Sequence, residues 1–301
     1  LRCSSRIPSQ ETQRPLGVHV IMFELHASRA WISAQSTPSS MGKSSSVKGA
    51  EKKAARAAAL AAEKERVAHV KSVASIAEPL ADFAPFVKAA KAKFGTEIEH
   101  YTAASMPETE HQFCFELLKR NMKQMRLDAV DGAGVPWGWK EAEEKATLRG
   151  EDARFLLLRP AAAAPADGSP TSVVAPEPAA PTGFVMFKWE LEGDCTVLYV
   201  YELQLAPAAR GNGLGKFVMQ LLELMATKHK MQFMMLTVFK INDGAMRFYL
   251  DKLKYSVDET SPSRCAVDDE SSYEILSKCL DKSLIENAKQ DADDLGPRLR
   301  S

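Results

Sequence analysis

A glycine-rich turn between two strand-like runs places the strongest constraint on how this chain can fold. The stretch ARGNGLGKFVMQLLELM occupies residues 209–225, and from Leu214 to Met225 its apolar residues recur every three or four positions. That spacing is typical of the buried face of an amphipathic helix. Strand-like runs flank the stretch, VLYVYELQL at 197–205 and MMLTVF at 234–239. A strand, a tight turn, a helix and a second strand together predict a crossover unit within one sheet.

The glycines of this turn lie where the predicted helix begins. Glycine adopts backbone conformations closed to other residues and lets a ligand approach the main chain closely. Free N–H groups at a helix start, with the positive end of the helix dipole behind them, suit a phosphate or pyrophosphate. Arg210 would add a forked cation for the same anion. A plain solvated turn between strand and helix is the alternative, and the glycines alone do not decide between the two.

Two common nucleotide-binding motifs do not match this turn. The dinucleotide-binding fingerprint needs G-x-G-x-x-G followed by an acidic residue about twenty positions later, whereas the chain reads R-G-N-G-L-G-K. A P-loop needs serine or threonine after Gly-Lys, and here Phe217 follows Lys216. The turn therefore matches neither of these motifs.

The composition limits the class of protein and its partners. The chain has 301 residues, of which 45% are hydrophobic, with 39 basic and 39 acidic side chains, which is typical of a soluble globular protein with one core-forming domain. A net charge of zero gives no reason to expect direct nucleic-acid binding. The five cysteines are scattered without paired spacing, so we expect neither a zinc site nor a disulfide framework, and a reducing compartment. The longest apolar run near the start, residues 16–25, is too short for a transmembrane helix.

The regions flanking the predicted domain differ from it in composition. Residues 1–40 are rich in Ser, Arg and Gln, and they read either as an organelle transit peptide or as a disordered, non-native upstream extension, with translation starting at Met41. We favour the second interpretation. The MGKSSS sequence that follows also matches the loose pattern for myristoylation of Gly42. We expect a charged, alanine-rich N-terminal helix within residues 41–78, a folded domain over 79–280, and a flexible C-terminal tail over 281–301.

The hydrophobic patterns predict a mixed α/β order within the domain, with helices on both sides of one sheet. Residues 79–88 are expected to form a loop and turn with buried aromatic residues. A Pro/Ala-rich stretch, residues 159–182, reads as a loop insertion between two strands because it cannot bury a core. Helices are predicted at 51–70, 110–125, 214–225 and 245–253, and strands at 154–158, 183–189, 197–205, 234–239, 255–257 and 271–278. The methionines of the helix at 110–125 are expected to be core residues.

One carboxylate stands out within the strand VLYVYELQL. Glu202 lies among apolar neighbours, where burial is costly unless it has a partner or a task. A bulge could bring it to a cleft at the centre of the sheet, where a raised pKa would suit a general base. The alternative is a glutamate at the strand end that reaches solvent. Simple alternation predicts that Tyr199, Tyr201, Leu203 and Leu205 share one face, and that Leu198, Val200, Glu202 and Gln204 share the other.

Taken together, these segments resemble one known family. The stretch from Arg210 to Gly215 is similar to the R/Q-x-x-G-x-G/A turn with which GNAT acetyltransferases hold the pyrophosphate of acetyl-CoA. The segments YELQL, KINDGAMRFYLDKLKYSVDETSPS and SYEILSK, with WGWK at 137–140, are similar to the NatD branch, which acetylates the N-termini of histones. The resemblance covers most of residues 41–278. It implies an α/β GNAT fold, with a central mixed, mostly antiparallel sheet flanked by helices and an N-terminal helical strap.

The resemblance also implies residue roles. It makes Glu202 the general base for the α-amino group, and it assigns backbone contacts with the pantetheine arm and the thioester to the residues that follow Glu202. The cofactor-binding residues it implies are Leu203, Gln204, Leu205, Arg210, Gly211, Asn212, Gly213, Leu214, Gly215, Lys216 and Asn242. The substrate-binding residues it implies are Trp137, Glu190, Tyr199, Tyr201, Thr237 and Tyr273.

Two positions depart from the NatD pattern. Arg126 stands where that branch has a tyrosine shortly before WGWK, and Glu190 stands where it has an aspartate. Two acidic groups, one at Glu190, Glu192 and Asp194 and the other at 268–270, could flank a cleft for a basic peptide. Read without the resemblance, they are two solvated acidic turns.

The function expected from the resemblance is transfer of an acetyl group from acetyl-CoA to the N-terminal α-amine of histone four and histone two-A, without a metal. We expect a monomer in nucleus and cytoplasm, with histone N-terminal tails as partners. Two alternatives stay open: a GNAT enzyme that acts on lysine side chains or small amines, and a non-catalytic module that binds CoA or a histone tail.

Overall fold

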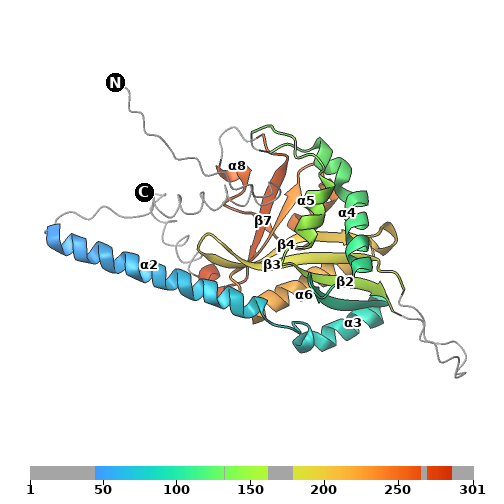
Figure 1. The fold of residues 1–301 in the computed structure, drawn as a ribbon, viewed down its shortest axis with the longest axis horizontal. Helices are drawn as coiled ribbons and strands as arrows, with labels where there is room; N and C mark the ends of the chain where they lie inside the picture. The colour runs from blue at the N-terminus through green and yellow to red at the C-terminus, as the bar shows by residue number, and fades with distance from the viewer. Residues whose placement is uncertain (1–44, 132, 162–178, 266–269, 287–301) are drawn as a thin grey trace, which may run out of the picture.

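The computed structural model describes residues 45–131, 133–161, 179–265 and 270–286, and it centres on a seven-stranded sheet (Figure 1). The order of the strands is β1-β2-β3-β4-β5-β7-β6. Met41, Gly42, most of the predicted insertion and most of the C-terminal tail lie outside the described residues. The strands are β1 (Thr96–Thr102), β2 (Arg154–Pro160), β3 (Gly183–Glu192), β4 (Cys195–Leu205), β5 (Phe233–Phe239), β6 (Ser256–Val257) and β7 (Tyr273–Cys279).

The sheet is antiparallel except at one place. Strands β1 to β4 pair with their neighbours along the chain, each antiparallel to the one before. Strands β4 and β5 pair in parallel, and the helix α6 (Leu214–Lys228) connects them. The predicted crossover unit and the mixed, mostly antiparallel sheet are therefore confirmed. Strands β2 and β3 pair directly, with Leu158 opposite Gly183, so the chain between them is a hairpin connection, as predicted.

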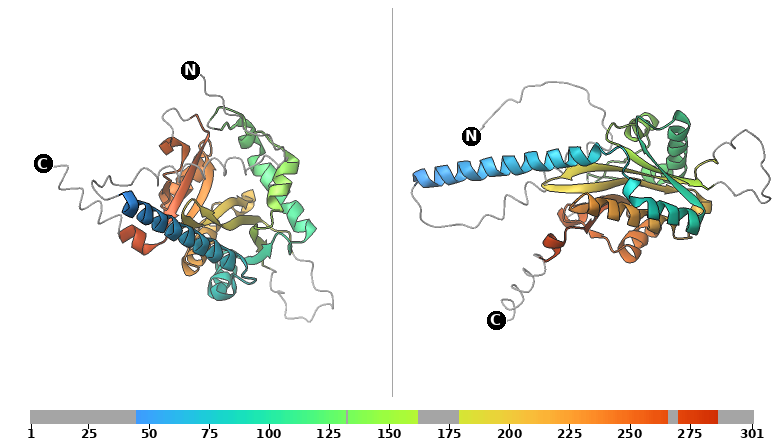
Figure 2. Two further views of the ribbon diagram at one scale, coloured as in Figure 1. Left: turned by 60° about the vertical axis from the view of Figure 1, so that its left-hand side comes forward. Right: turned by 90° about the horizontal axis from the view of Figure 1, so that it is seen from below.

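Helices cover both faces of the sheet, as the edge-on view in Figure 2 shows. The face with α6 also holds α3 (Ala84–Phe94) and the end of α2 (Ser45–Ala74), and the large core cluster that they share extends from Val73 to Leu276. The opposite face holds α4 (Glu108–Asp128) and α5 (Glu141–Leu148), over a second cluster centred on Phe155 and Phe184. After β5 the chain forms the short helix α7 (Asp243–Arg247), a π-helical turn η3 (Phe248–Lys252) and, later, α8 (Pro262–Cys265).

The apolar stripe of α6 packs as its spacing predicts. Leu214, Val218, Leu221 and Leu222 are fully buried against the sheet, together with Met225. The polar positions between them face away from the core, which fixes the rotation of the helix about its axis. The start of α6, and with it the glycine turn, is thereby held at the end of β4.

The N-terminal helix α2 contacts the domain only through its last turns. Its side chains at 52–65 are exposed, whereas Val73 is buried against the sheet. Two polar contacts support this packing. Arg66 forms an ion pair of 2.6 Å with Asp194, and a ring nitrogen of His69 lies 3.0 Å from the carbonyl oxygen of His229. Figure 1 shows the rest of the helix extending beyond the sheet.

The prediction of a loop and turn over residues 79–88 holds for residues 79–80 and is wrong from residue 81 on. The chain there forms a 3-10 turn, η1 (Ala81–Phe83), followed directly by α3. Pro85 misleads the sequence-based interpretation because it lies in the first turn of α3, where a missing N–H costs nothing. The buried aromatic residue that we expected there is present as Phe83. Strand β1 and helices α5 and α8 were also not predicted.

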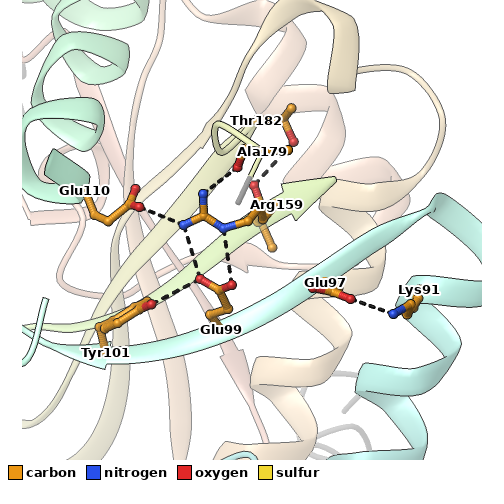
Figure 3. A network of polar contacts seen from close by, with 9 residues as sticks. Lys91, Glu97, Glu99, Tyr101, Glu110, Arg159, Ala179 and Thr182 are labelled. Carbon is orange, nitrogen blue, oxygen red and sulfur yellow. Dashed lines mark hydrogen bonds and ion pairs between the residues drawn. The ribbon is translucent and has the colours of Figure 1, made fainter. Parts of the chain in front are cut away.

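A buried arginine, Arg159, connects strands β1 and β2 with helix α4 (Figure 3). Arg159, on β2, is only 5% exposed, and it contacts Glu99 on β1 at 3.2 Å and Glu110 on α4 at 2.7 Å. Its guanidinium also donates a hydrogen bond of 2.5 Å to the carbonyl oxygen of Ala179, where the described chain resumes before β3. One cation thus holds two strands, a helix and the returning chain together.

Candidate active site

A β-bulge in β4 determines which side chains reach the site. Met186 pairs with Glu202 and Phe187 with Val200, so Tyr201 is the extra residue on β4. A bulge shifts the alternation of faces by one position. Leu203 and Leu205 therefore pack on the α6 face, whereas Tyr199 and Tyr201 lie on the α4 face. The prediction that these four residues share a face is wrong for this reason.

Beyond the bulge, β4 and β5 separate. They pair only along Val197–Val200 and Phe233–Leu236, so residues 201–205 of β4 lie beyond the end of that pairing. A cavity of about 710 Å³ lies at this place. Its lining comes from β4, β5, α4, α5, the glycine turn, α7 and η3. The sequence predicted neither this volume nor the contribution of α5 and η3.

Most of the residues expected to hold the cofactor line this cavity. They are Leu203, Gln204, Leu205, Arg210, Gly211, Gly213, Gly215, Lys216 and Asn242. The two others do not. Leu214 is buried in the core below the turn, and the side chain of Asn212 accepts a hydrogen bond of 3.0 Å from the Leu214 N–H. Asn242 likewise caps α7 by accepting from the Ala245 N–H.

The backbone of the glycine turn leaves room for a ligand beside it. Gly211 and Gly213 have φ of +80° and +94°, which side chains rarely allow, and a Cβ at Gly211 would meet nothing within 4 Å. Gly213 is the N-cap of α6, so the N–H groups of Gly215 and Lys216 have no partner within the helix, whereas that of Leu214 donates to Asn212. Lys216 from the helix start and Lys252 from η3 line the same cavity. Open space, free N–H donors and cations fit the pyrophosphate of a CoA-type carrier.

Arg210 links the turn to the end of β4. Its Nε donates to the carbonyl oxygen of Leu205 at 3.0 Å, and its Nη2 donates to Asn121 Oδ1 at 2.8 Å. The amide of Asn121, on α4, donates to the same Leu205 oxygen at 3.2 Å and to Gln204 Oε1 at 2.9 Å. The sequence-based prediction missed Asn121. The available signal was a polar residue within the apolar stripe formed by Leu117, Leu118, Met122 and Met125.

Glu202 is buried at the cavity wall and both of its oxygens have donors. Its side chain is 11% exposed. Oε1 accepts from Arg126 Nη2 at 2.7 Å and Oε2 accepts from Gln204 Nε2 at 2.8 Å. Burial raises the pKa of Glu202, while the charge of Arg126 and the bond from Gln204 oppose that rise, and the net direction is upward. A carboxylate of this kind is a stronger base than one in water.

Arg126 extends from α4 and contacts both α5 and β4. Besides Glu202 it contacts Glu144, with Nη1 at 2.6 and 2.8 Å from the two carboxylate oxygens. Burial raises the pKa of Glu144 as well, against the charge of Arg126. The sequence showed Arg126 as a departure from a family pattern but gave no sign of its partner, because Glu144 lies in an acid-rich segment without periodicity. Met122 and Met125, expected in the core, are half-buried and line the cavity.

Four of the residues expected to contact the acceptor line the cavity. These are Trp137, Tyr199, Tyr201 and Thr237. The hydroxyls of Tyr199 and Thr237 share a hydrogen bond of 2.6 Å. Burial raises the pKa of both tyrosines well above the usual value, so these phenols stay neutral at ordinary pH and act as hydrogen-bonding groups.

Glu190 and Tyr273 are not among the lining residues. Glu190 lies behind Tyr201, whose hydroxyl donates to its two oxygens at 3.2 Å, and Tyr273 packs against the Trp137 ring at a centroid distance of 5.4 Å. Both support lining residues. Burial, followed by the charge of Glu192, raises the pKa of Glu190 to about 7. None of the described members of the two acidic groups lines the cavity.

Among the described ranges of the chain, no group of three or more His, Cys, Asp and Glu side chains is arranged to hold a metal ion. Over the same ranges, no helix combines the length and the apolar character needed to cross a membrane.

One family model and several solved structures are similar to part of this chain. Residues 136–255 match the model of the acetyltransferase (GNAT) family. Among solved structures, nourseothricin acetyltransferase is 20% identical, with 43% of this chain and 66% of that chain covered and a TM-score of 0.31. Ard1 from Thermoplasma volcanium is 13% identical over 62% and 97% of the two chains, with a TM-score of 0.40. Arabidopsis thaliana NAA60, in complex with a bisubstrate analogue, is 11% identical over 60% and 97%, with a TM-score of 0.39.

The matched range contains β4, the glycine turn, α6 and β5, which form the parallel pair and part of the cavity lining described above. The seven-stranded mixed sheet flanked by helices is the GNAT fold, and residues 136–255 are similar to the acetyltransferase (GNAT) family.

Proposed function

We propose that this chain is a NatD-type N-terminal acetyltransferase that acts on histone four and histone two-A, whose N-termini begin Ser-Gly-Arg-Gly. The observation that carries the proposal is the buried carboxylate of Glu202, held at the wall of the cavity beside the open end of β4. A module that only bound CoA would not need a carboxylate at that place. The residue-by-residue resemblance to NatD and the GNAT family match support it further.

The glycine turn and the end of β4 would hold the donor. Acetyl-CoA supplies the acetyl group as a thioester when bound. The N–H groups after Gly213 and the cations of Arg210 and Lys216 would bind its pyrophosphate. The peptide groups of residues 203–205 lie beyond the pairing with β5 and would bind the pantetheine arm. A backbone N–H in this segment would stabilise negative charge on the reacting carbonyl oxygen.

Glu202 would accept the proton that activates the amine. An N-terminal α-ammonium has a pKa of about 7.7–8.0 and must lose a proton before its nitrogen becomes a nucleophile. The carboxylate of Glu202, directly or through one water molecule, can accept that proton. Tyr199 and Tyr201 stay neutral, so within the lining they do not compete with Glu202 as bases.

The acceptor side of the cavity suits a short, flexible peptide start. Trp137 and the two tyrosines provide apolar walls with hydroxyl groups, and Thr237 adds a further hydroxyl. Glu144 and Glu202 both line the cavity and share a single buried arginine, which leaves this wall with net negative charge. Negative charge favours an α-ammonium and the arginine of Ser-Gly-Arg-Gly. Histone tails are accordingly the proposed partners, and the nucleus and cytoplasm the proposed location.

The test is acetyl transfer from acetyl-CoA to a Ser-Gly-Arg-Gly-Lys-Gly peptide, with the modified position mapped by mass spectrometry. A copy of the peptide with a blocked N-terminus is the control. We expect acetylation of the α-amine in the free peptide only. Acetylation of the lysine in both peptides would replace the proposal with a lysine acetyltransferase, and no transfer to either, with CoA still bound, would reject the histone assignment.

A further inference from the structure

The guanidinium of Arg126 joins three elements at the cavity wall. Through Nη1 it binds both oxygens of Glu144 on α5, and through Nη2 it binds Oε1 of Glu202 on β4. The three side chains are 10%, 10% and 11% exposed. Arg126 is also among the residues that line the cavity. Two carboxylates therefore share one cation in a place with little water, where charges act strongly on one another.

The other elements packed around Glu202 bring little charge to it. On η3, Tyr249 stays neutral because burial raises its pKa. On β4 itself, Gln204 donates an amide hydrogen bond and carries no charge. Lys216 and Lys252 line the same cavity, but both are exposed, so solvent screens them. The charged side chains connected to Glu202 are thus Arg126, which contacts it directly, and Glu144, which shares that arginine.

The orientation of Glu202 depends on the same contacts. Arg126 occupies one carboxylate oxygen and Gln204 the other, and Gln204 is itself held by the amide of Asn121. Without Arg126, nothing among the described contacts of Glu202 would fix Oε1. A lysine at the same place would keep the charge but would not reach two carboxylates with a planar fork.

We propose that Arg126 is the positioning residue of this site: it fixes the Glu202 carboxylate in one orientation and holds it ionised against the negative charge of Glu144. For catalysis, this inference rests on the proposed role of Glu202 as proton acceptor. The pairing of the three charges can be measured without any acceptor peptide, and this separates the two claims.

The two neighbours of Glu202 have opposite effects on its ionisation. In Glu144→Gln a like charge disappears, so Glu202 ionises at lower pH. In Arg126→Met a cation disappears, so Glu202 ionises at higher pH, by about one pH unit or more. The pH below which kcat/KM falls should shift in the same two directions. In Arg126→Lys, the pH below which kcat/KM falls should be close to that of the unmodified protein, because the positive charge is kept. Its kcat should stay several-fold lower, because lysine lacks the planar guanidinium that binds two carboxylates.

The direct measurement is a carbon-13 NMR titration of the glutamate carboxyl groups in the full chain. Glu202→Gln identifies the resonance by its loss. We expect the Glu202 resonance to titrate together with that of Glu144 in the parent, to shift to lower pH in Glu144→Gln and to higher pH in Arg126→Met. An unchanged or raised midpoint in Glu144→Gln would overturn the inference. That variant leaves one cation facing one carboxylate, so it keeps the test valid even if Arg126→Met fails to fold.

The kinetic and NMR results distinguish the possible failures. If Glu202→Gln keeps full activity while both titration shifts occur, the proposed base is wrong and the charge pairing stands. If every Arg126 variant loses activity equally at all pH values and the titration midpoints do not shift, Arg126 is only a structural residue and the inference fails.

Discussion

At the scale of single residues, the same arrangement, a buried arginine between two carboxylates, occurs at two places that differ in their role. Arg159 and Arg126 are both buried, and each binds two carboxylates from different elements. Arg159 holds β1, β2 and α4 together and does not line the cavity, whereas Arg126 does. Removing one partner of such a cluster leaves an uncompensated charge, which typically costs about 3–5 kcal/mol. Only the cluster at Arg126 lies at the cavity, so only there would such a loss also affect the proposed reaction.

Glu202→Gln should reduce kcat by a factor on the order of 100 or more, with little change in the Kd for CoA. The amide keeps the shape of the side chain but cannot accept a proton at neutral pH. Stopped-flow or coupled assays give kcat, and calorimetry gives the Kd. Glu99→Gln is the matched control, because it removes a carboxylate from Arg159 instead, and it should lower stability while leaving kcat unchanged. Equal loss of kcat in both variants would contradict the assignment.

Glu190 should make the protein less stable as the pH rises through the range from about 4.3, the pKa of a free glutamate, to about 7, its pKa in the fold. Over that range the folded state keeps a proton that the unfolded state has lost, so stability falls with pH and then levels off. Glu190→Gln removes this penalty. It should raise Tm relative to the parent at pH 8 and change it little at pH 4, by differential scanning calorimetry. Asp194→Asn, at an exposed ion pair, should show no such difference.

At the scale of elements, the sequence predicted the strands and helices whose buried residues recur at the regular spacing of a strand or a helix. Strands β2 to β5 and helix α6 are long and apolar, and all of them were expected. Strand β1 was missed because it is at the edge of the sheet and carries Glu97, Glu99 and His100, as edge strands often do. Helix α5 is only eight residues long and acid-rich. The bulge at Tyr201 depends on how two strands pair, so the β4 alternation alone could not locate it.

Gly213→Ala should weaken CoA binding and lower stability by about 1 kcal/mol or more, because an alanine resists φ of +94°. Gly95→Ala is the matched control, because Gly95 also has a positive φ, of +61°, but does not line the cavity. Isothermal titration with CoA should show a clear loss of affinity for the first variant and a small change for the second. A reversed order would mean that the backbone of Gly213 is not what positions the turn.

At the scale of the whole molecule, α2 is a helix of 30 residues, about 45 Å long at 1.5 Å per residue, that is fixed at one end. Val73→Ala should lower the free energy of unfolding by about 1–3 kcal/mol, because it empties a buried position against the sheet. Leu60→Ala, in the exposed part where Leu60 is 53% exposed, should change it by about 0.5 kcal/mol or less. Urea unfolding curves measure both. Equal losses would show that the extended part of α2 also packs on a surface.

The strand order has a consequence for how the protein folds as well as for what it binds. Strands β3 and β4 can pair first, since a tight turn joins Glu192 to Cys195. The parallel pairing of β4 with β5 must wait for α6, and β7 then inserts between β5 and β6. Pairings over long sequence separations form slowly. Pulsed hydrogen exchange during refolding should protect amides of β3 and β4 before those of β5 and β7, so that the cleft between β4 and β5 closes around its ligand site late in folding.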